Sequence, residues 1–214
     1  MKKIILIAWI CCAGSLEAQQ QADPSFVWGG LAGFESQFIN IQSISVNAQE
    51  HMSVDAGRAV PGGCLGVFGR WGLTKGLSYQ QELTFSTLQS RVDFYPDGTE
   101  YYHFTDVELP MHFVLTNSAD PDAPLRGSFL LGARVGWNFA EQTSSKLYLL
   151  HERLAIDAGL GVEVRLKKWR LQPEFVYSLG LNNLHNVTNA PYDWVAGRVV
   201  RDKLIFRLLF WIAY

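Results

Sequence analysis

The sequence predicts an all-β fold, an eight-stranded antiparallel up-and-down β-barrel that spans a membrane. The first observation is the segment 154–166, where aliphatic residues occupy every even position from Leu154 to Leu166 and Asp157 and Glu163 occupy odd ones. A strict two-residue period is typical of a strand that faces two environments. The second is length, because this segment has thirteen residues, whereas a strand in a soluble domain usually has about five or six. Such a length suits a strand that crosses a bilayer. The third is recurrence, since seven other segments repeat the pattern.

The first four segments are 26–36, 62–73, 77–95 and 101–115. The first is rich in glycine, and the second places Leu65 and Val67 on one face. In the third and fourth, apolar residues such as Phe85 alternate with polar ones such as Glu82 and Glu108. Each of these segments therefore predicts a strand with one apolar face.

The last four segments are 128–140, 154–166, 170–182 and 203–214. The eighth is unusual, because its inner face carries Ile205, Leu209 and Trp211. Pro110 in the fourth segment and Pro173 in the seventh each remove a backbone donor, and we expect a β-bulge at each.

The connections between the segments differ in length on the two sides of the predicted barrel. Residues 74–76 and 167–169 form tight turns, and 116–127 is a longer, turn-rich connection on the same side. The other side has 37–61, 96–100, 141–153 and 183–202, which we expect to be loops. Short turns opposite long loops are typical of bacterial outer membrane barrels, with both termini in the periplasm.

The N-terminus has the pattern of a secretory signal peptide. Lys2 and Lys3 precede an apolar run at 4–13, and small residues lead to a cleavage point after Ala18. Removing 18 residues from 214 leaves the range 19–214, which suits one barrel domain. Lipidation of Cys11 or Cys12 is disfavoured, because the residue before a lipidated cysteine is normally small.

The composition of the range 19–214 excludes several classes. It holds 16 basic and 19 acidic residues, and this lack of basic excess argues against nucleic acid as a partner. Cys64 is its single cysteine, so no intrachain disulfide can form. No apolar run in it reaches the length of a spanning helix.

The apolar faces are predicted to contact lipid and the charged faces to line the lumen. Aromatic residues at two levels predict the girdles of a membrane barrel, and the chain ends on the aromatic Tyr214. A soluble barrel of the lipocalin kind would reverse the two faces. The predicted girdle residues are Trp71, Tyr79 and Trp169 at one end and Tyr101, Tyr102, Trp137 and Phe139 at the other. The predicted lumen charges are Glu82, Asp106, Glu108, Arg134, Asp157, Glu163, Arg165, Arg170, Glu174 and Arg207. Arg91, on the outward face, is expected above the membrane.

An eight-stranded barrel is filled by its own side chains. We therefore expect that it conducts no solutes and that its lumen charges form a structural network of ion pairs.

The best catalytic candidates are His51 and Ser53 with Glu50, but they lie in a predicted loop, and we expect no enzyme activity, metal or cofactor. His112 is predicted to be a hydrogen-bonded interior histidine. His103 should face away from the nearby carboxylates, so they cannot share a metal.

The second half of the chain resembles a known family. The run Asp-Val-Glu-Leu-Pro-Met at 106–111 is similar to a strand of small Bacteroidetes barrels. The segment 154–166, followed by 169–184 with Pro173-Glu174 and Gly-Leu-Asn-Asn at 180–183, resembles the PorT family. The resemblance covers about 105–214. It implies an outer membrane component required for the type IX secretion system, which supports motility in gliding species, and it implies no catalytic residues.

Two functions follow as expectations. In the first, the barrel contacts outer membrane lipid and other type IX secretion components, with no nucleic acid and no small-molecule substrate. In the second, it is a stand-alone structural or adhesive barrel that binds through the loops 37–61 and 183–202.

Overall fold

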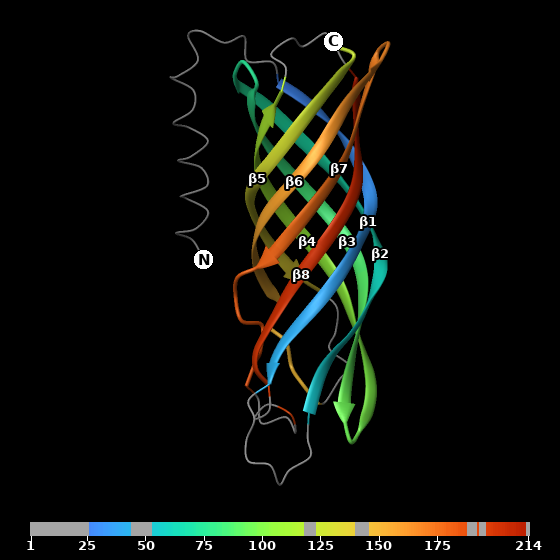
Figure 1. Ribbon diagram of the computed structural model, residues 1–214, viewed down its shortest axis with the longest axis vertical. Helices are drawn as coiled ribbons and strands as arrows, with labels where there is room; N and C mark the ends of the chain where they lie inside the picture. The colour runs from blue at the N-terminus through green and yellow to red at the C-terminus, as the bar shows by residue number, and fades with distance from the viewer. Residues whose placement is uncertain are drawn as a thin grey trace.

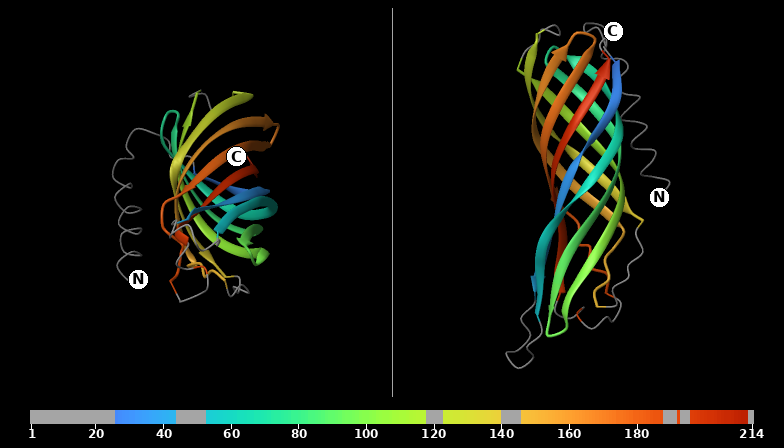
Figure 2. Two further views of the ribbon diagram at one scale, coloured as in Figure 1. Left: turned by 60° about the horizontal axis from the view of Figure 1, so that its bottom comes forward. Right: turned by 90° about the vertical axis from the view of Figure 1, so that its right-hand side faces the viewer.

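The computed structural model describes residues 26–43, 53–117, 123–139, 146–187, 192 and 196–212. Over these residues the chain is a closed barrel in which each strand pairs with the next and β8 pairs with β1, always antiparallel. Figures 1 and 2 show the strands tilting around a common axis. The strands are β1 Phe26–Ser43, β2 Ser53–Thr74, β3 Leu77–Tyr95, β4 Gly98–Thr116, β5 Leu125–Asn138, β6 Glu152–Leu166, β7 Trp169–Gly180 and β8 Ala196–Ile212. The predicted eight-stranded fold is confirmed, whereas the predicted signal peptide lies outside the described residues.

The two faces of the strands differ in exposure as predicted. Leu160 on the outer wall is 64% exposed, whereas Glu108 on the inner wall is 1% exposed. The alternation holds along most of β3, β4, β6 and β7. A soluble barrel would place its apolar side chains inside, so that alternative is excluded. Among the described residues, no helix is long and apolar enough to span a membrane.

An apolar belt, interrupted at Gln81, surrounds the barrel near its tight-turn end. The tight-turn end is at the top of Figure 1. In β3 and β4 it runs from the pair Leu77 and Leu115 to the pair Phe85 and Val107. Nine residues, at about 3.3 Å each and tilted by about 40°, rise by about 23 Å, close to the roughly 25 Å band of outer membrane barrels. The belt therefore has the height of a bilayer core.

Aromatic side chains border the belt on both sides. At the tight-turn end, the ring centroids of Phe26 and Trp71 lie 5.0 Å apart, and the Tyr79 ring is 5.8 Å from that of Trp71. At the other end, Trp137 and Phe139 are exposed. Tyr101 is also exposed, but it pairs with Arg91 beyond the belt and so lies on the extension. Tyr102 is buried, because consecutive strand residues point to opposite faces. The prediction of Tyr101 and Tyr102 as girdle residues is therefore wrong.

Five strands continue beyond the belt, and we call this part of the barrel the extension. β1 to β4 have 18, 22, 19 and 19 residues and β8 has 17, whereas β5, β6 and β7 have 14, 15 and 12. The expected loop 37–61 is thus largely wrong, because β1 reaches Ser43 and β2 starts at Ser53. The expected connections 96–100 and 183–202 are too long, because β4 starts at Gly98 and β8 starts at Ala196. Outside the belt most outward residues, such as Asn40 and Gln42, are polar, so these strands lack the apolar stripe that identified the others.

The extension has two sheet layers, visible at the bottom of Figure 1. One contains β2, β3 and β4, and the other contains β1 and β8. Segments near 148–150 and 184–186 join the second layer through backbone hydrogen bonds, among them Leu184 N to Val199 O at 2.8 Å and Leu150 N to Leu184 O at 2.6 Å. The core between the layers, which we call the apolar cap, consists of Ile39, Val54, Leu88, Val92, Phe94, Tyr102, Phe104, Leu147, Leu149, Leu184, Tyr192, Ala196 and Val199.

The two strand prolines are accommodated without the expected bulges. Around Pro110, the pairing of β3 with β4 skips from Met111 to Glu108 and resumes in the same register. Around Pro173, the pairing of β6 with β7 skips from Leu171 to Glu174 in the same way. Each proline therefore interrupts the ladder on one side only, as its missing N–H requires.

Candidate functional surfaces

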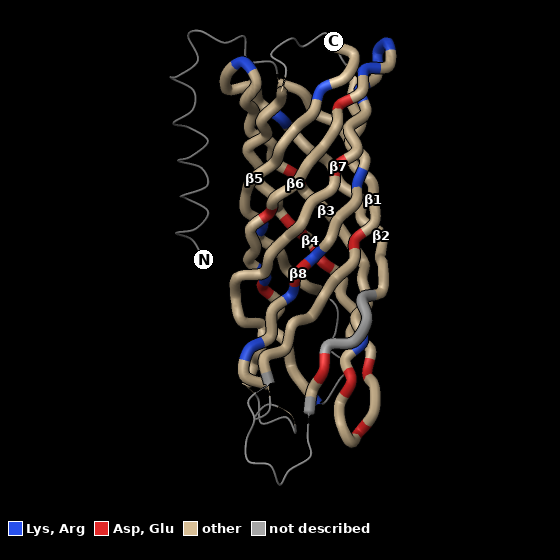
Figure 3. Tube along the Cα trace, in the orientation of Figure 1, with Lys and Arg blue, Asp and Glu red and all other residues tan. Residues whose placement is uncertain are grey.

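The interior of the belt is filled by charged side chains of both signs. Among the described residues, seven buried carboxylates and seven buried cations point inward. They are Glu35, Glu82, Asp106, Glu108, Asp157, Glu163 and Glu174, and Arg70, Arg134, Arg153, Arg170, Arg201, Lys203 and Arg207. Figure 3 shows both signs intermixed through the barrel. Because buried charge is costly unless paired, this balance indicates a structural network.

Nine of the ten predicted lumen charges are buried, and Arg165 near the tight-turn end is partly exposed. The prediction missed Glu35, Arg70, Arg153, Arg201 and Lys203. Arg153 and Arg201 were assigned to loops, and Lys203 was placed at a strand end. The continued alternation into those segments was the signal that could have identified them.

His112 lies at the centre of one half of the network. Its Nδ1 is 3.1 Å from Glu82 Oε1, and its Nε2 is 2.9 Å from Asp157 Oδ2. Arg207 Nη2 donates to Glu82 at 2.8 Å, and Arg134 Nε donates to Asp157 at 2.9 Å. The predicted interior histidine is confirmed, and each ring nitrogen has a carboxylate partner.

Glu108 is the centre of the other half. It accepts hydrogen bonds from Arg134 Nη1 at 2.6 Å, Arg153 Nη1 at 3.1 Å and Lys203 Nζ at 2.9 Å. Lys203 also contacts Glu35 at 3.0 Å. The two halves share Arg134, so one connected network crosses the lumen.

Two apolar clusters close the lumen above and below this network. At the tight-turn end, Leu31, Phe68, Leu209 and Trp211 pack together, and Arg70 lies 5.2 Å from the Trp211 ring centroid. The inward placement of Leu209 and Trp211 agrees with the prediction for β8. At the other end, the apolar cap fills the extension. The interior therefore offers no continuous aqueous path among the described residues.

This closure predicts that the purified protein will not conduct ions. Reconstituted into a planar phospholipid bilayer, it should give no steady single-channel steps, because packed side chains occupy the lumen. Alanine variants of the network, such as Arg134→Ala with Glu108→Ala, serve as the comparison, since they remove lumen volume. Regular conductance steps from the unaltered protein would contradict a closed lumen.

The catalytic candidates are not brought together by the described structure. Glu50 and His51 lie outside the described residues, and of Ser53 only its place at the start of β2 is described. His103 is exposed on the outer wall, 3.3 Å from Gln89, while Asp106 and Glu108 are buried inside. Within the described ranges, no group of three or more His, Cys, Asp or Glu residues could hold a metal ion.

The outer wall of the extension is mostly polar, with Tyr95 and Tyr101 exposed on it. Arg91 Nε donates to Asp93 at 2.9 Å, and the Thr99 hydroxyl donates to the same oxygen at 2.5 Å. Arg91 thus lies on the outward face and outside the apolar belt, as expected. Acidic positions gather at the end of the β2–β3–β4 layer, including Asp55, Asp93, Asp97 and Glu100.

The residues that carry the PorT resemblance have structural contacts. Glu174 accepts from Arg207 Nε at 2.7 Å inside the barrel. Asn182 and Asn183 fix the end of β7, because their side chains bond to the backbone of Leu154, Glu152 and Val199.

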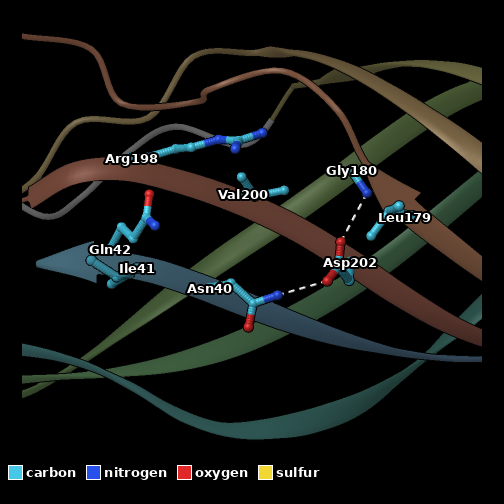
Figure 4. A pocket seen from close by; sticks show the side chains of 8 residues that line it. All are labelled: Asn40, Ile41, Gln42, Leu179, Gly180, Arg198, Val200 and Asp202. Atoms are coloured by element: carbon cyan, nitrogen blue, oxygen red, sulfur yellow. Dashed lines mark hydrogen bonds between the residues drawn. The ribbon is translucent and has the colours of Figure 1, made fainter.

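Arg201 and Asp202 point to opposite sides of β8. Arg201 Nη2 is 2.5 Å from Asp106 Oδ2 inside the barrel. On the outer wall, Asp202 accepts from Gly180 N at 2.8 Å and from Asn40 Nδ2 at 2.6 Å, as Figure 4 shows. The hollow around it, lined also by Arg198 and Gln42, lies where β7 ends beside β8. Asp202 therefore acts as a cap for the free end of β7.

Comparisons with known proteins agree with this architecture. A profile of the outer membrane protein beta-barrel domain family matches residues 18–186. Among solved structures, the chain is similar to the outer membrane protein OprG from Pseudomonas aeruginosa, with a TM-score of 0.55 and 12% identity over 88% of this chain and 96% of that chain. It is also similar to the attachment invasion locus protein Ail of Yersinia pestis, with a TM-score of 0.42 and 10% identity over 87% of this chain and 98% of that chain.

At 12% identity, the OprG likeness supports the fold alone. No curated protein matches the chain in sequence. The family profile covers most of the chain, and the apolar belt explains why a protein of this family resides in the bacterial outer membrane. This chain belongs to the outer membrane protein beta-barrel domain family.

Proposed function

We propose that this protein is a non-catalytic outer membrane component required for protein export by the type IX secretion system, acting through contacts with other secretion components. The observation that carries the proposal is the closed interior, because a barrel filled by ion pairs and an apolar cap has only its surfaces left for function. The resemblance of residues 105–214 to the PorT family supports the choice of secretion system.

Deletion of the gene tests this role. Cargo proteins that carry the C-terminal signal domain should accumulate in the periplasm, and a gliding species should lose motility. Immunoblots of periplasmic and extracellular fractions measure the effect, and complementation with the unaltered gene is the control. Normal export in the deletion strain would contradict the secretion role.

A stand-alone structural or adhesive role is the second candidate. It is favoured by the extension, which lies beyond the belt and exposes Tyr95 and Tyr101. Purification after mild detergent extraction separates the two proposals, because a secretion component should retain partner proteins and a stand-alone barrel should not.

We also propose that both termini lie in the periplasm, so that the extension faces the outside of the cell. Val187, 73% exposed on the extension, offers a test. The Val187→Cys variant should react with a membrane-impermeant maleimide on intact cells, while the unaltered protein, whose Cys64 is buried, should not. Labelling only after cell lysis would show the opposite orientation.

A further inference from the structure

The ring of strands is interrupted between β1 and β2 within the extension. The two strands pair from Phe26 to Glu35 of β1, and the last partner in β2 is Gly62. Beyond this point, and within the part of the chain that the structure describes, residues 36–43 pair only with β8, and residues 53–61 pair only with β3. Figure 1 shows β1 and β2 diverging below the belt. Each layer of the extension therefore ends in a strand edge at this seam.

A strand edge carries backbone N–H and C=O groups that no neighbouring strand satisfies, and proteins normally protect such edges. The β2 edge is protected in three ways. Pro61 lacks an N–H, Asp55 places a charge on the edge, and the pairing with β3 shifts register twice, between Ala56 and Ala59 and between Val60 and Gly63. Bulges, charge and proline are the usual means of blocking strand addition.

The β1 edge has none of these protections. Residues 36–42 read Ser-Gln-Phe-Ile-Asn-Ile-Gln, without charge, proline or glycine, and their pairing with β8 is regular up to Gln42. Side chains that point into the barrel also fix the position of this edge. Ile39 is buried in the apolar cap, and Gln37 donates to Ser90 Oγ at 3.0 Å and accepts from Arg201 Nε at 2.9 Å. A fixed edge binds with a smaller loss of conformational entropy.

We propose that residues 36–42 of β1 bind an extended segment of a partner protein, which adds to the extension as an antiparallel strand. This inference rests on the proposed function in one respect, namely that the protein works through partner contacts, and it locates such a contact. Backbone pairing at a free edge is an established mode of peptide recognition.

The surroundings indicate the chemistry of the segment. Its inward side chains would lie beside Ile39 and Val54, which favours small or branched apolar residues. Its outward side chains would face the β2 edge across the seam, where Asp55 carries an exposed carboxylate, which favours lysine or arginine. We therefore expect a segment in which apolar residues alternate with polar and basic ones.

A second copy of this chain does not fit the edge. Antiparallel pairing of two β1 edges requires a two-fold axis perpendicular to the strands. In a membrane, that axis would turn one barrel upside down relative to the other. The occupant is therefore a different polypeptide.

Peptide binding to the purified barrel in detergent tests the edge. The probe is a fluorescent nine-residue peptide in which valine alternates with threonine or lysine. Two further peptides have the same sequence but carry backbone N-methyl groups, one on its odd-numbered residues and the other on its even-numbered residues. Each therefore lacks the N–H donors along one of its two edges. Fluorescence anisotropy should show that only one of the two methylated peptides binds more weakly, by about tenfold or more. That peptide lacks the donors that face β1, so several hydrogen bonds are lost.

Amide hydrogen exchange locates the binding. Without peptide, seam-facing amides within residues 36–42 should exchange roughly 100-fold faster than those of 154–162 in β6, and the unmethylated peptide should slow them. The Asn40→Lys/Gln42→Lys variant should bind the basic peptide several-fold more weakly, with Val187→Lys as its matched control. Equal effects of the two methylation patterns, or slow exchange at 36–42 without peptide, would overturn the proposal. Normal export in the deletion strain would instead remove the secretion role alone.

Discussion

Replacing Glu108 by glutamine is expected to lower the free energy of unfolding by about 3 to 5 kcal/mol, the range for breaking a buried ion pair from one side. Glu108 is 1% exposed and accepts hydrogen bonds from Arg134, Arg153 and Lys203. Glutamine keeps the shape of the side chain but removes the negative charge that three buried cations share. The seven carboxylates and seven cations of the lumen would then no longer balance.

Urea titration in detergent, followed by the heat-modifiable shift of the folded barrel on gels, measures this effect. The matched control is Glu152→Gln, at the exposed start of β6, which should change stability by less than about 0.5 kcal/mol. Equal midpoints for the two variants would show that the lumen charges do not stabilise the barrel.

Replacing Leu160 by arginine should destabilise the membrane-inserted barrel by about 2 to 4 kcal/mol, as expected for a charge at the bilayer midplane. Leu160 lies on the outer wall of β6, paired with Phe129 and Phe175 in the middle of the belt. An arginine there would face hydrocarbon with no partner. The effect should fall if the bilayer is replaced by a fluid detergent micelle.

The measurement is the unfolding equilibrium in phosphatidylcholine vesicles. Val187→Arg, with its side chain 73% exposed on the extension, is the control and should leave stability nearly unchanged. If Leu160→Arg were as stable as the control, the apolar belt would not be in contact with lipid.

The sequence predicted the spanning part of the barrel well because the membrane imposes a strong pattern there. Because the lumen holds charged side chains and the outer wall contacts hydrocarbon, every second residue must change character, and this shows in 154–166. The same alternation placed His112 and most of the lumen charges correctly. It failed for Tyr102, which was grouped with its neighbour Tyr101 although adjacent residues face opposite ways.

The extension could not be recognised in this way. Outside the belt both environments of a strand are ordinary for soluble proteins, and outward residues such as Asn40 and Gln42 resemble those of a loop. Its core also depends on contacts between residues far apart in the chain, such as Phe94 with Tyr192 at 4.8 Å between ring centroids. Local periodicity carries no information about such contacts.

The sequence by itself determined that eight strands cross a membrane, which faces meet lipid, and that the lumen holds charges of both signs. Only the tertiary structure decided which charges pair, that an apolar cap closes one end, and that β1 and β2 separate to leave a free edge. The physical reason is that each residue's polarity reflects the environment on its side of the strand. Strand length beyond the membrane and the choice of partners depend instead on packing across the whole barrel.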